Sequence, residues 1–347
     1  MTIAQARSVP IQPDVPDGIP ILDIGPCLGG DAHAVEDLAK RLGRIQQEIG
    51  FYFIINHGVP SGLIARANEQ LRCFYALPLE EKLKLRINAK SSGYVPAKST
   101  VYVTSNVNQN TKPDLNECLL IMRERPADHP SIIAGRRFVG PNQWPDEKLV
   151  PGFRETMLEY YAAMEALGYK MLPLYARALD LPRDYFAPFF SDPTWTTRNQ
   201  YYPPVPAEEN QFGISPHRDH GFLTLLPLSE EPGLEIRAPS GKWLPASGDG
   251  ARDGIIVNTG EFLNRWSNGR FIATPHRVVP PKRDRYSIAF FFNPTWDTLS
   301  EALPTCVGPG HPPRFEPMKF LDYLCWYVDK NYSRSGGGQQ DDAAMRS

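Results

Sequence analysis

The spacing of hydrophobic residues divides the chain into a helical first part and a second part made of short strands. In residues 33–50, hydrophobic side chains recur at steps of three and four, which predicts an amphipathic helix that stops at Gly50. The run FYFIIN (51–56) predicts a buried strand, and residues 63–75 a second helix. A third, longer helix is predicted over 153–180, where Pro173 is expected to introduce a kink.

From about residue 196 onward, short hydrophobic runs separated by turn residues replace the helical pattern. The 27 glycines and 35 prolines of the chain favour many short strands and turns over a bundle of helices. Such a series is typical of a β-sandwich or a closed barrel. The six predicted strands are TTRNQYY, FLTLLPL, GLEIR, GIIVN, HRVV and YSIAFFFN.

Composition and charge narrow the class of protein. A net charge of −2 gives no electrostatic reason to expect nucleic acid or an acidic membrane as a partner. The five cysteines are widely scattered, which argues against a disulfide framework or a zinc knuckle and favours a reducing compartment. The chain starts without a signal-peptide pattern and has no run of eighteen apolar residues. We therefore expect a cytoplasmic protein without an obligate protein partner, as a monomer or a weak homo-oligomer.

The stretch ISPHRDHGFLTLL (214–226) places two histidines and an aspartate just ahead of an apolar run. Side chains two apart in an extended segment share a face, so His217 and Asp219 are expected to point one way and His220 the other. The pair His217 and Asp219 is suited to one metal ion, but a lone H-x-D pattern is weak evidence and a third ligand is needed.

His276 is the best candidate for that third ligand. It lies in ATPHRVV, and among the seven histidines it alone enters a strand-like run within the β region. Two histidines and one carboxylate on one face of an ion leave the other face open. This arrangement suits non-haem Fe(II) that reacts with oxygen.

Two further motifs supply groups that suit a carboxylate ligand. Arg285 and Ser287 share a strand face in RYSIAFFF, which is too apolar for a solvent-exposed strand, and a guanidinium beside a hydroxyl binds carboxylates well. In RNQYYPP, Arg198 and Tyr202 share a face, and the Tyr202 phenol can reach the same carboxylate.

Taken together, these motifs resemble those of the isopenicillin N synthase-like family of Fe(II)- and 2-oxoglutarate-dependent oxygenases. The chain has QYYPP (200–204), HRD (217–219), HRV (276–278) and RYS (285–287) in the family order. The resemblance covers roughly residues 19–330. Further segments that look like the family are IPILDI (19–24), GFYFIINHG (50–58), FYALPLEEK (74–82) and NGRFIATPHRV (268–278).

The resemblance implies a mainly β fold with flanking helices. Its core is a double-stranded β-helix, or jelly roll, with an N-terminal helical region and a C-terminal helix packed outside. On this basis we divide the chain into a loose arm (1–18), a mixed helical region of the same fold (19–195), the catalytic core (196–300), a C-terminal helix (301–332) and a disordered tail (333–347).

The resemblance also assigns roles to the motif residues. It implies His217, Asp219 and His276 as iron ligands. It implies Arg285, Ser287 and Tyr202 as the groups that bind the distal carboxylate of 2-oxoglutarate. Gln200 stands where the family often has Asn, and its role stays open.

The implied reaction consumes O2 and 2-oxoglutarate and releases succinate and CO2. It oxidises an unactivated C–H bond of a small organic substrate by hydroxylation, desaturation or cyclisation, and ascorbate is expected as a reductant. Candidate substrate-pocket residues come from the strands just described and from the polar stretch 91–110, which is placed where a lid could lie. They are Arg198, Tyr94, Tyr102, Asn106, Phe291 and Asn293.

Other functions stay open at this point. Isopenicillin N synthase itself shares the ligands and the Arg-x-Ser motif yet uses O2 without 2-oxoglutarate. The same three ligands are also suited to a Zn²⁺-dependent hydrolase, in which the metal activates water. A jelly-roll binding module without catalysis is the third alternative, although it would need neither the ligands nor the carboxylate-binding residues.

Overall fold

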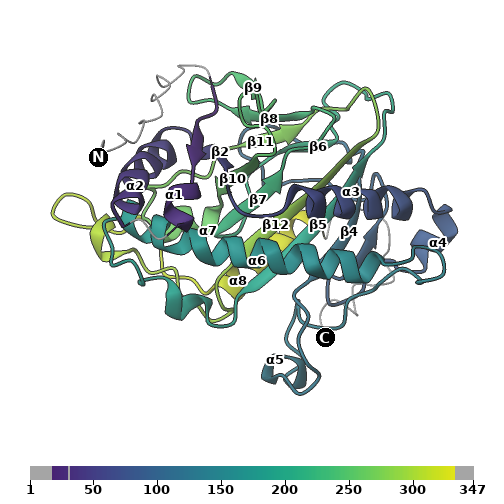
Figure 1. Ribbon diagram of the computed structural model, residues 1–347, viewed down its shortest axis with the longest axis horizontal. Coiled ribbons are helices and arrows are strands. Elements are labelled where there is room, and N and C mark those ends of the chain that lie inside the picture. The colour runs from purple at the N-terminus through teal and green to yellow at the C-terminus, as the bar shows by residue number, and fades with distance from the viewer. Residues whose placement is uncertain (1–17, 30–31, 333–347) are drawn as a thin grey trace, which may run out of the picture.

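The computed structural model describes residues 18–29 and 32–332 and contains two β-sheets flanked by helices (Figure 1). The predicted arm, apart from Gly18, and the predicted tail (333–347) lie outside the described residues. Eight α-helices are found in this part: α1 (Gly25–Leu28), α2 (Ala32–Glu48), α3 (Ser61–Tyr75), α4 (Leu79–Leu83), α5 (Pro130–Ile133), α6 (Phe153–Ala178), α7 (Glu261–Trp266) and α8 (Phe320–Tyr332).

Twelve strands form the two sheets of the described chain. The larger sheet has the order β1-β2-β10-β7-β12-β5-β4-β3, and the smaller has the order β6-β11-β8-β9. The strands are β1 (Ile21–Asp23), β2 (Phe51–Ile55), β3 (Gly93–Val95), β4 (Glu117–Met122), β5 (Thr194–Tyr202), β6 (Ile214–His217), β7 (Leu223–Pro227), β8 (Leu234–Arg237), β9 (Trp243–Pro245), β10 (Ile255–Thr259), β11 (His276–Val278) and β12 (Arg285–Asn293).

The two sheets form a jelly roll, as the family resemblance implies. Strand pairs are antiparallel except for β1 and β2, which run parallel. A hydrophobic cluster that draws on both sheets includes Phe51, Ile214, Ile236 and Val278. Since inward-facing side chains of the two sheets meet there, the reaction site is expected at this interior.

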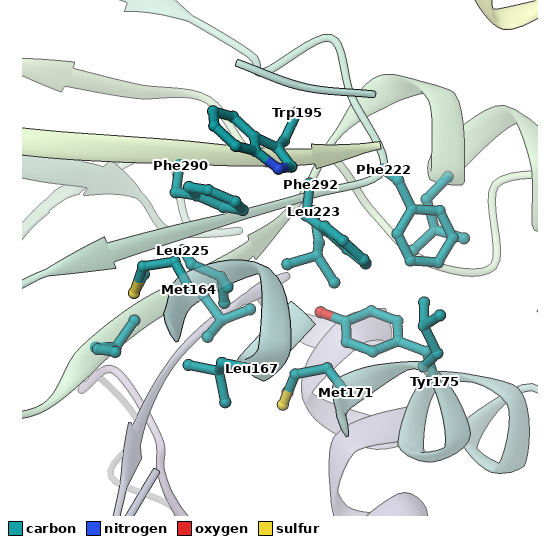
Figure 2. Close-up of a cluster of buried hydrophobic side chains, with 14 of the residues drawn as sticks. Met164, Leu167, Met171, Tyr175, Trp195, Phe222, Leu223, Leu225, Phe290 and Phe292 are labelled. Carbon is teal, nitrogen blue, oxygen red and sulfur yellow. The ribbon is translucent and has the colours of Figure 1, made fainter. Parts of the chain in front are cut away.

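Strand β12 is buried on both faces, which explains why its sequence is almost continuously apolar. One face carries Arg285 and Ser287 toward the interior between the sheets. The other face carries Phe290 and Phe292 into a large hydrophobic cluster between β12 and α6, where they face side chains of that helix such as Met164 (Figure 2). The helix therefore supports the strand that forms one wall of the site.

The predicted helices are confirmed, but the N-terminal region contributes more strands than the sequence pattern shows. Helix α2 ends before Gly50, whose φ of +65° and close approach to the Ile272 carbonyl leave no room for a Cβ atom. Strands β1, β2, β3 and β4 all join the larger sheet. Helix α6 continues through Pro173.

At the other end, the C-terminal helix is shorter than predicted. Only Phe320–Tyr332 is helical as α8, apart from a single 3₁₀ turn at Pro304–Cys306. The prolines at 309, 312, 313 and 317 explain this difference, because proline lacks the backbone N–H that a helix needs. Among the described residues, none of the helices is long and apolar enough to cross a membrane.

Candidate metal and co-substrate site

Strand pairing brings three candidate metal ligands together from two parts of the chain. Strand β6 ends at His217, Asp219 follows in the next loop, and His276 begins β11 opposite His217. The Nε2 atoms of His217 and His276 lie 3.7 and 3.6 Å from Oδ1 of Asp219. Within the described chain, these are the residues whose ligand atoms cluster tightly enough to hold a metal ion.

Backbone carbonyl groups orient the two imidazole rings. Nδ1 of His217 lies 2.8 Å from the Ser215 carbonyl oxygen, and Nδ1 of His276 lies 3.2 Å from the Thr274 carbonyl oxygen. Each ring therefore donates its N–H through Nδ1, which leaves the lone pair of Nε2 directed at Asp219. Burial also lowers the pKa of His217, and the neighbouring His276 acts in the same direction, so this ring is neutral at pH 7.

Two side chains orient the carboxylate of Asp219. Its Oδ2 accepts hydrogen bonds from Oγ1 of Thr224 at 2.6 Å and from Nδ2 of Asn258 at 2.7 Å, so Oδ1 is the oxygen that remains for an ion. Burial raises the pKa of Asp219, but the two histidines and these hydrogen bonds outweigh it and hold the pKa below its ordinary value. An ionised carboxylate beside a neutral imidazole is the form that binds metal, so this donor set fits a divalent cation.

A cavity of about 70 Å³ lies beside these three residues. Its walls come from β2, β5, β6, β7, β8, β10, β11 and β12, together with Tyr102 from the loop after β3 and Tyr327 from α8. Segments far apart in the sequence thus enclose one space between the two sheets.

Arg285 presents unpaired hydrogen-bond donors in this cavity. The residue is 3% exposed, and its Nε and Nη1 atoms are buried without a hydrogen-bond partner among the described residues. Its guanidinium carbon lies 4.7 Å from the centre of the Tyr202 ring, and Ser287 lines the same wall. Because an unpaired buried donor is costly, these atoms favour a ligand with acceptor oxygens at this end of the cavity, such as a carboxylate.

The structure places three of the six candidate pocket residues at the cavity. Arg198, Tyr102 and Phe291 line it. The ring of Tyr102 stacks on His217 with 4.7 Å between the ring centres. Burial raises the pKa of Tyr202 and lowers the pKa of His217, and the charge of Arg198 acts to lower both pKa values.

The other three candidates lie elsewhere, and we leave them out of the pocket. Tyr94 is in β3 at the edge of the larger sheet, where its hydroxyl donates to Glu117 at 2.5 Å. The Oδ1 atom of Asn293 accepts from the Phe222 backbone N–H at 2.8 Å, so this side chain closes a loop. Asn106 accepts from Arg218 in a neighbouring groove of about 230 Å³, which adjoins the cavity at His217.

His220 differs from its expected position. The alternation of an extended strand stops with β6 at His217, so His220 is not turned away but lines the same cavity. It still does not join the metal-ligand group, as expected from the sequence.

Several residues that shape the site were missed from the sequence. They include Thr224 and Asn258, which hold Asp219, and Phe51, whose ring centre lies 5.2 Å from that of His276. A signal was present for two of them. Thr224 and Asn258 are polar residues inside the apolar runs LTLLP and IIVNT, and a buried polar side chain needs a partner.

A buried group of two histidines and one carboxylate inside a jelly roll is typical of the mononuclear non-haem iron oxygenases. The chain matches two family models in agreement with this assignment. Residues 19–147 match the non-haem dioxygenase N-terminal region named for morphine synthesis, and residues 194–294 match the 2OG-Fe(II) oxygenase superfamily.

Individual relatives agree with the family models. The 2-oxoglutarate-Fe(II) type oxidoreductase hxnY of Emericella nidulans is 35% identical, over 92% of both chains. Kihadalactone A synthase of Citrus sinensis is 33% identical, over 84% of this chain and 87% of its own. The crystal structure of a full-length Neurospora crassa protein in complex with alpha-KG (2-oxoglutarate) and 5-formyluracil has a TM-score of 0.78 and 26% identity, and covers 92% of this chain and 98% of its own.

The chain therefore belongs to the Fe(II)- and 2-oxoglutarate-dependent oxygenases of the isopenicillin N synthase-like clan. It is a non-haem dioxygenase that uses Fe(II), 2-oxoglutarate and O2 and acts on a small molecule. The use of ascorbate as a reductant stays a prediction.

Proposed function

We propose that His217, Asp219 and His276 hold the Fe(II), and that Arg285, Ser287 and Tyr202 bind the distal carboxylate of 2-oxoglutarate. The observation that carries this assignment is the convergence of three oriented ligand atoms beside a buried arginine with two unpaired nitrogens. When bound, iron and 2-oxoglutarate would supply the oxidant: O2 is consumed, succinate and CO2 are released, and the substrate either gains one oxygen atom or loses two hydrogen atoms.

The protein's own residues prepare this chemistry. The apolar walls around the cavity exclude bulk water, which protects the reaction from side reactions. Nδ1 of each ligand histidine is held by a backbone carbonyl, so neither ring can rotate freely. Arg285 lies under the Tyr202 ring, which fixes the guanidinium against the β5 wall.

We further propose that the substrate is a small molecule with an acidic or polar group that Arg198 binds. Arg198 lines the cavity on the same face of β5 as Tyr202, and its charge acts on several cavity residues. The Neurospora crassa protein has been solved with thymine and with 5-formyluracil, which are small, flat molecules with carbonyl oxygens. The cavity is compact, and Arg198 gives it a second guanidinium in addition to that of Arg285, which we assign to the co-substrate. Such a cavity is suited to a molecule of this kind.

We infer that the enzyme works in the cytoplasm as a monomer or a weak homo-oligomer, without nucleic acid, a membrane or an obligate protein as partner. The net charge of −2 gives no electrostatic reason to expect nucleic acid or an acidic membrane as a partner. In the described chain the five cysteines form no disulfide, which is typical of a reducing compartment.

Anaerobic titration tests the assignment of the co-substrate site. Addition of Fe(II) and then 2-oxoglutarate to metal-free protein is expected to produce the weak visible charge-transfer band of the chelate. The band should fade in Arg285→Gln at the same concentrations and persist in Arg283→Gln, a matched change at a side chain that is 80% exposed. Equal bands in both variants would show that Arg285 does not bind the co-substrate.

Two more variants test the metal ligands and the pocket. Asp219→Ala should lose Fe(II) affinity, and an unchanged affinity would mean that the three ligands are wrongly assigned.

Arg198→Ala should keep the charge-transfer band but bind substrate more weakly. Loss of the band in Arg198→Ala would refute the separate role for Arg198.

A further inference from the structure

His220 is the histidine of the HRDH motif to which the iron site gives no role. It lines the reaction cavity, yet its nitrogens make no hydrogen bond to any described residue. Its ring lies at 30° to the ring of Phe291 and at 31° to the ring of Tyr327, with ring centres 5.7 and 4.8 Å apart. Aromatic contacts therefore occupy the face of the imidazole, and its edge, which carries both nitrogens, remains for a polar partner.

This arrangement distinguishes His220 from the two ligand histidines. The rings of His217 and His276 each use Nδ1 to bind a backbone carbonyl and turn Nε2 to Asp219. His220 has neither contact, although it neighbours Asp219 in the sequence. An imidazole has at least one N–H in every protonation state that proteins populate, so its edge always offers a donor.

Other hydrogen-bond donors line the same cavity. Gln200 is 3% exposed and lines the same space, and its Nε2 has no hydrogen-bond partner among the described residues, while its Oε1 accepts from Ser287 at 3.4 Å. Arg198 adds a guanidinium to this wall. A substrate without acceptor oxygens would keep these buried donors unpaired and would bind weakly. A substrate with acceptor oxygens is favoured.

We propose that His220 determines which substrates the enzyme accepts, by donating a hydrogen bond from its ring edge to a carbonyl or carboxylate oxygen of the substrate. The inference rests on the proposed function, in which Arg285 holds the co-substrate and leaves the rest of the cavity for the substrate. Arg198 and His220 then bind oxygen atoms of the same molecule, and two such contacts fix its orientation relative to the iron ligands.

The variant His220→Phe tests this role because it keeps a ring beside Phe291 and Tyr327 but removes both nitrogens. The probes are thymine, benzoate and, as a molecule of similar size without an acceptor, toluene. Each is titrated anaerobically into protein loaded with Fe(II) and 2-oxoglutarate, and the change in the charge-transfer band is followed. Thymine or benzoate should bind His220→Phe at least tenfold more weakly than wild type. The affinity for toluene should be the same in both proteins.

Two companion variants separate this effect from damage to the site. His220→Gln restores an N–H donor without the ring and should recover part of the affinity. His311→Phe makes the same chemical change on an exposed loop and should match wild type.

The outcomes also distinguish this inference from the proposed function. If wild type forms no band with Fe(II) and 2-oxoglutarate, the proposed function fails. If the band forms but neither thymine nor benzoate perturbs it, or both bind wild type and His220→Phe equally, the role of His220 is overturned.

Discussion

Thr224 and Asn258 fix the orientation of Asp219 without being candidate iron ligands themselves. Thr224→Val has almost the same shape but lacks the hydroxyl that donates to Oδ2 at 2.6 Å. Loss of such a supporting hydrogen bond typically lowers metal affinity by about 10- to 100-fold. We expect that decrease in an anaerobic Fe(II) titration of Thr224→Val, whereas Thr224→Ser, which keeps the hydroxyl, should remain close to wild type.

Asp114 gives the protein a dependence of stability on pH. Its Oδ1 accepts from the backbone N–H and the hydroxyl of Ser215 at 2.9 and 2.6 Å, and its Oδ2 is buried without a partner in the described chain. Burial raises the pKa of Asp114 to about 7, although the two hydrogen bonds and the charge of Arg198 act in the opposite direction.

The sign of the effect follows from this raised pKa. The folded protein keeps the proton up to about pH 7, whereas the unfolded chain releases it near the ordinary value of 3.8. Stability from this group is therefore present at low pH and is lost as the pH rises from about 4 to about 7. One pKa unit corresponds to about 1.4 kcal/mol, so the loss is on the order of a few kcal/mol.

Urea unfolding at pH 5 and pH 8 measures this contribution. Asp114→Asn keeps an acceptor oxygen for Ser215 but cannot titrate. We expect the free energy of unfolding of Asp114→Asn to rise relative to that of wild type as the pH increases from 5 to 8. The same difference between the two proteins at both pH values would contradict the raised pKa.

At the scale of elements, helix α6 packs tightly against β12. A Cβ atom at Gly168 would lie 2.8 Å from Cγ of Phe292. Gly168→Ala should destabilise the protein by about 1–3 kcal/mol through overpacking, although alanine favours a helix by about 1 kcal/mol over glycine. Gly62→Ala in α3 is the control, because nothing lies within 4 Å of its Cβ position. Thermal unfolding of both variants gives the comparison, and a Gly168→Ala variant as stable as Gly62→Ala would contradict the packing.

The alternation of side chains along strands predicted the faces of the site but not its limits. Arg285, Ser287 and Phe291 share one face of β12 and line the cavity, as expected. Asn293 lies on that face too, but the cavity ends before it, where the backbone of Phe222 closes over the side chain. The end of the cavity is set by a loop from another part of the chain. The alternation of side chains along a strand holds no information about the position of that loop.

Long-range pairing was the second limit of the sequence. Nothing in the polar stretch 91–110 shows that Tyr94 pairs at the far edge of the sheet while Tyr102 lies on His217. The ordered motifs were sufficient to predict that His217, Asp219 and His276 come together, because each lies in or beside a strand that pairs within the core.

At the scale of the whole molecule, the N-terminal region and the jelly roll share one sheet. Strand β2 pairs with β10, and Phe51 of β2 lines the cavity beside His276. Neither part can therefore complete its hydrogen bonds without the other. Although separate family models match the two regions, the described chain is expected to behave as one folding unit.

Two spectroscopic signals in the full chain test this unity. Far-ultraviolet circular dichroism is dominated by the long helices α2, α3 and α6 of the N-terminal region, whereas five of the six tryptophans lie at residue 195 or beyond. Urea unfolding curves from dichroism and from tryptophan fluorescence should coincide. Two separated midpoints would show that the regions unfold independently.

The double burial of β12 restricts how this sequence can change over time. The strand alternates between residues that face the chemistry and residues that anchor α6, so insertion or deletion of a single residue would exchange the two sets. Phenylalanines would then fill the cavity, and Arg285 would be forced into the hydrophobic cluster. Lineages that diverge from this enzyme are expected to keep the length of residues 285–292 unchanged and to vary in the loops, where new substrate preferences can arise without loss of the fold.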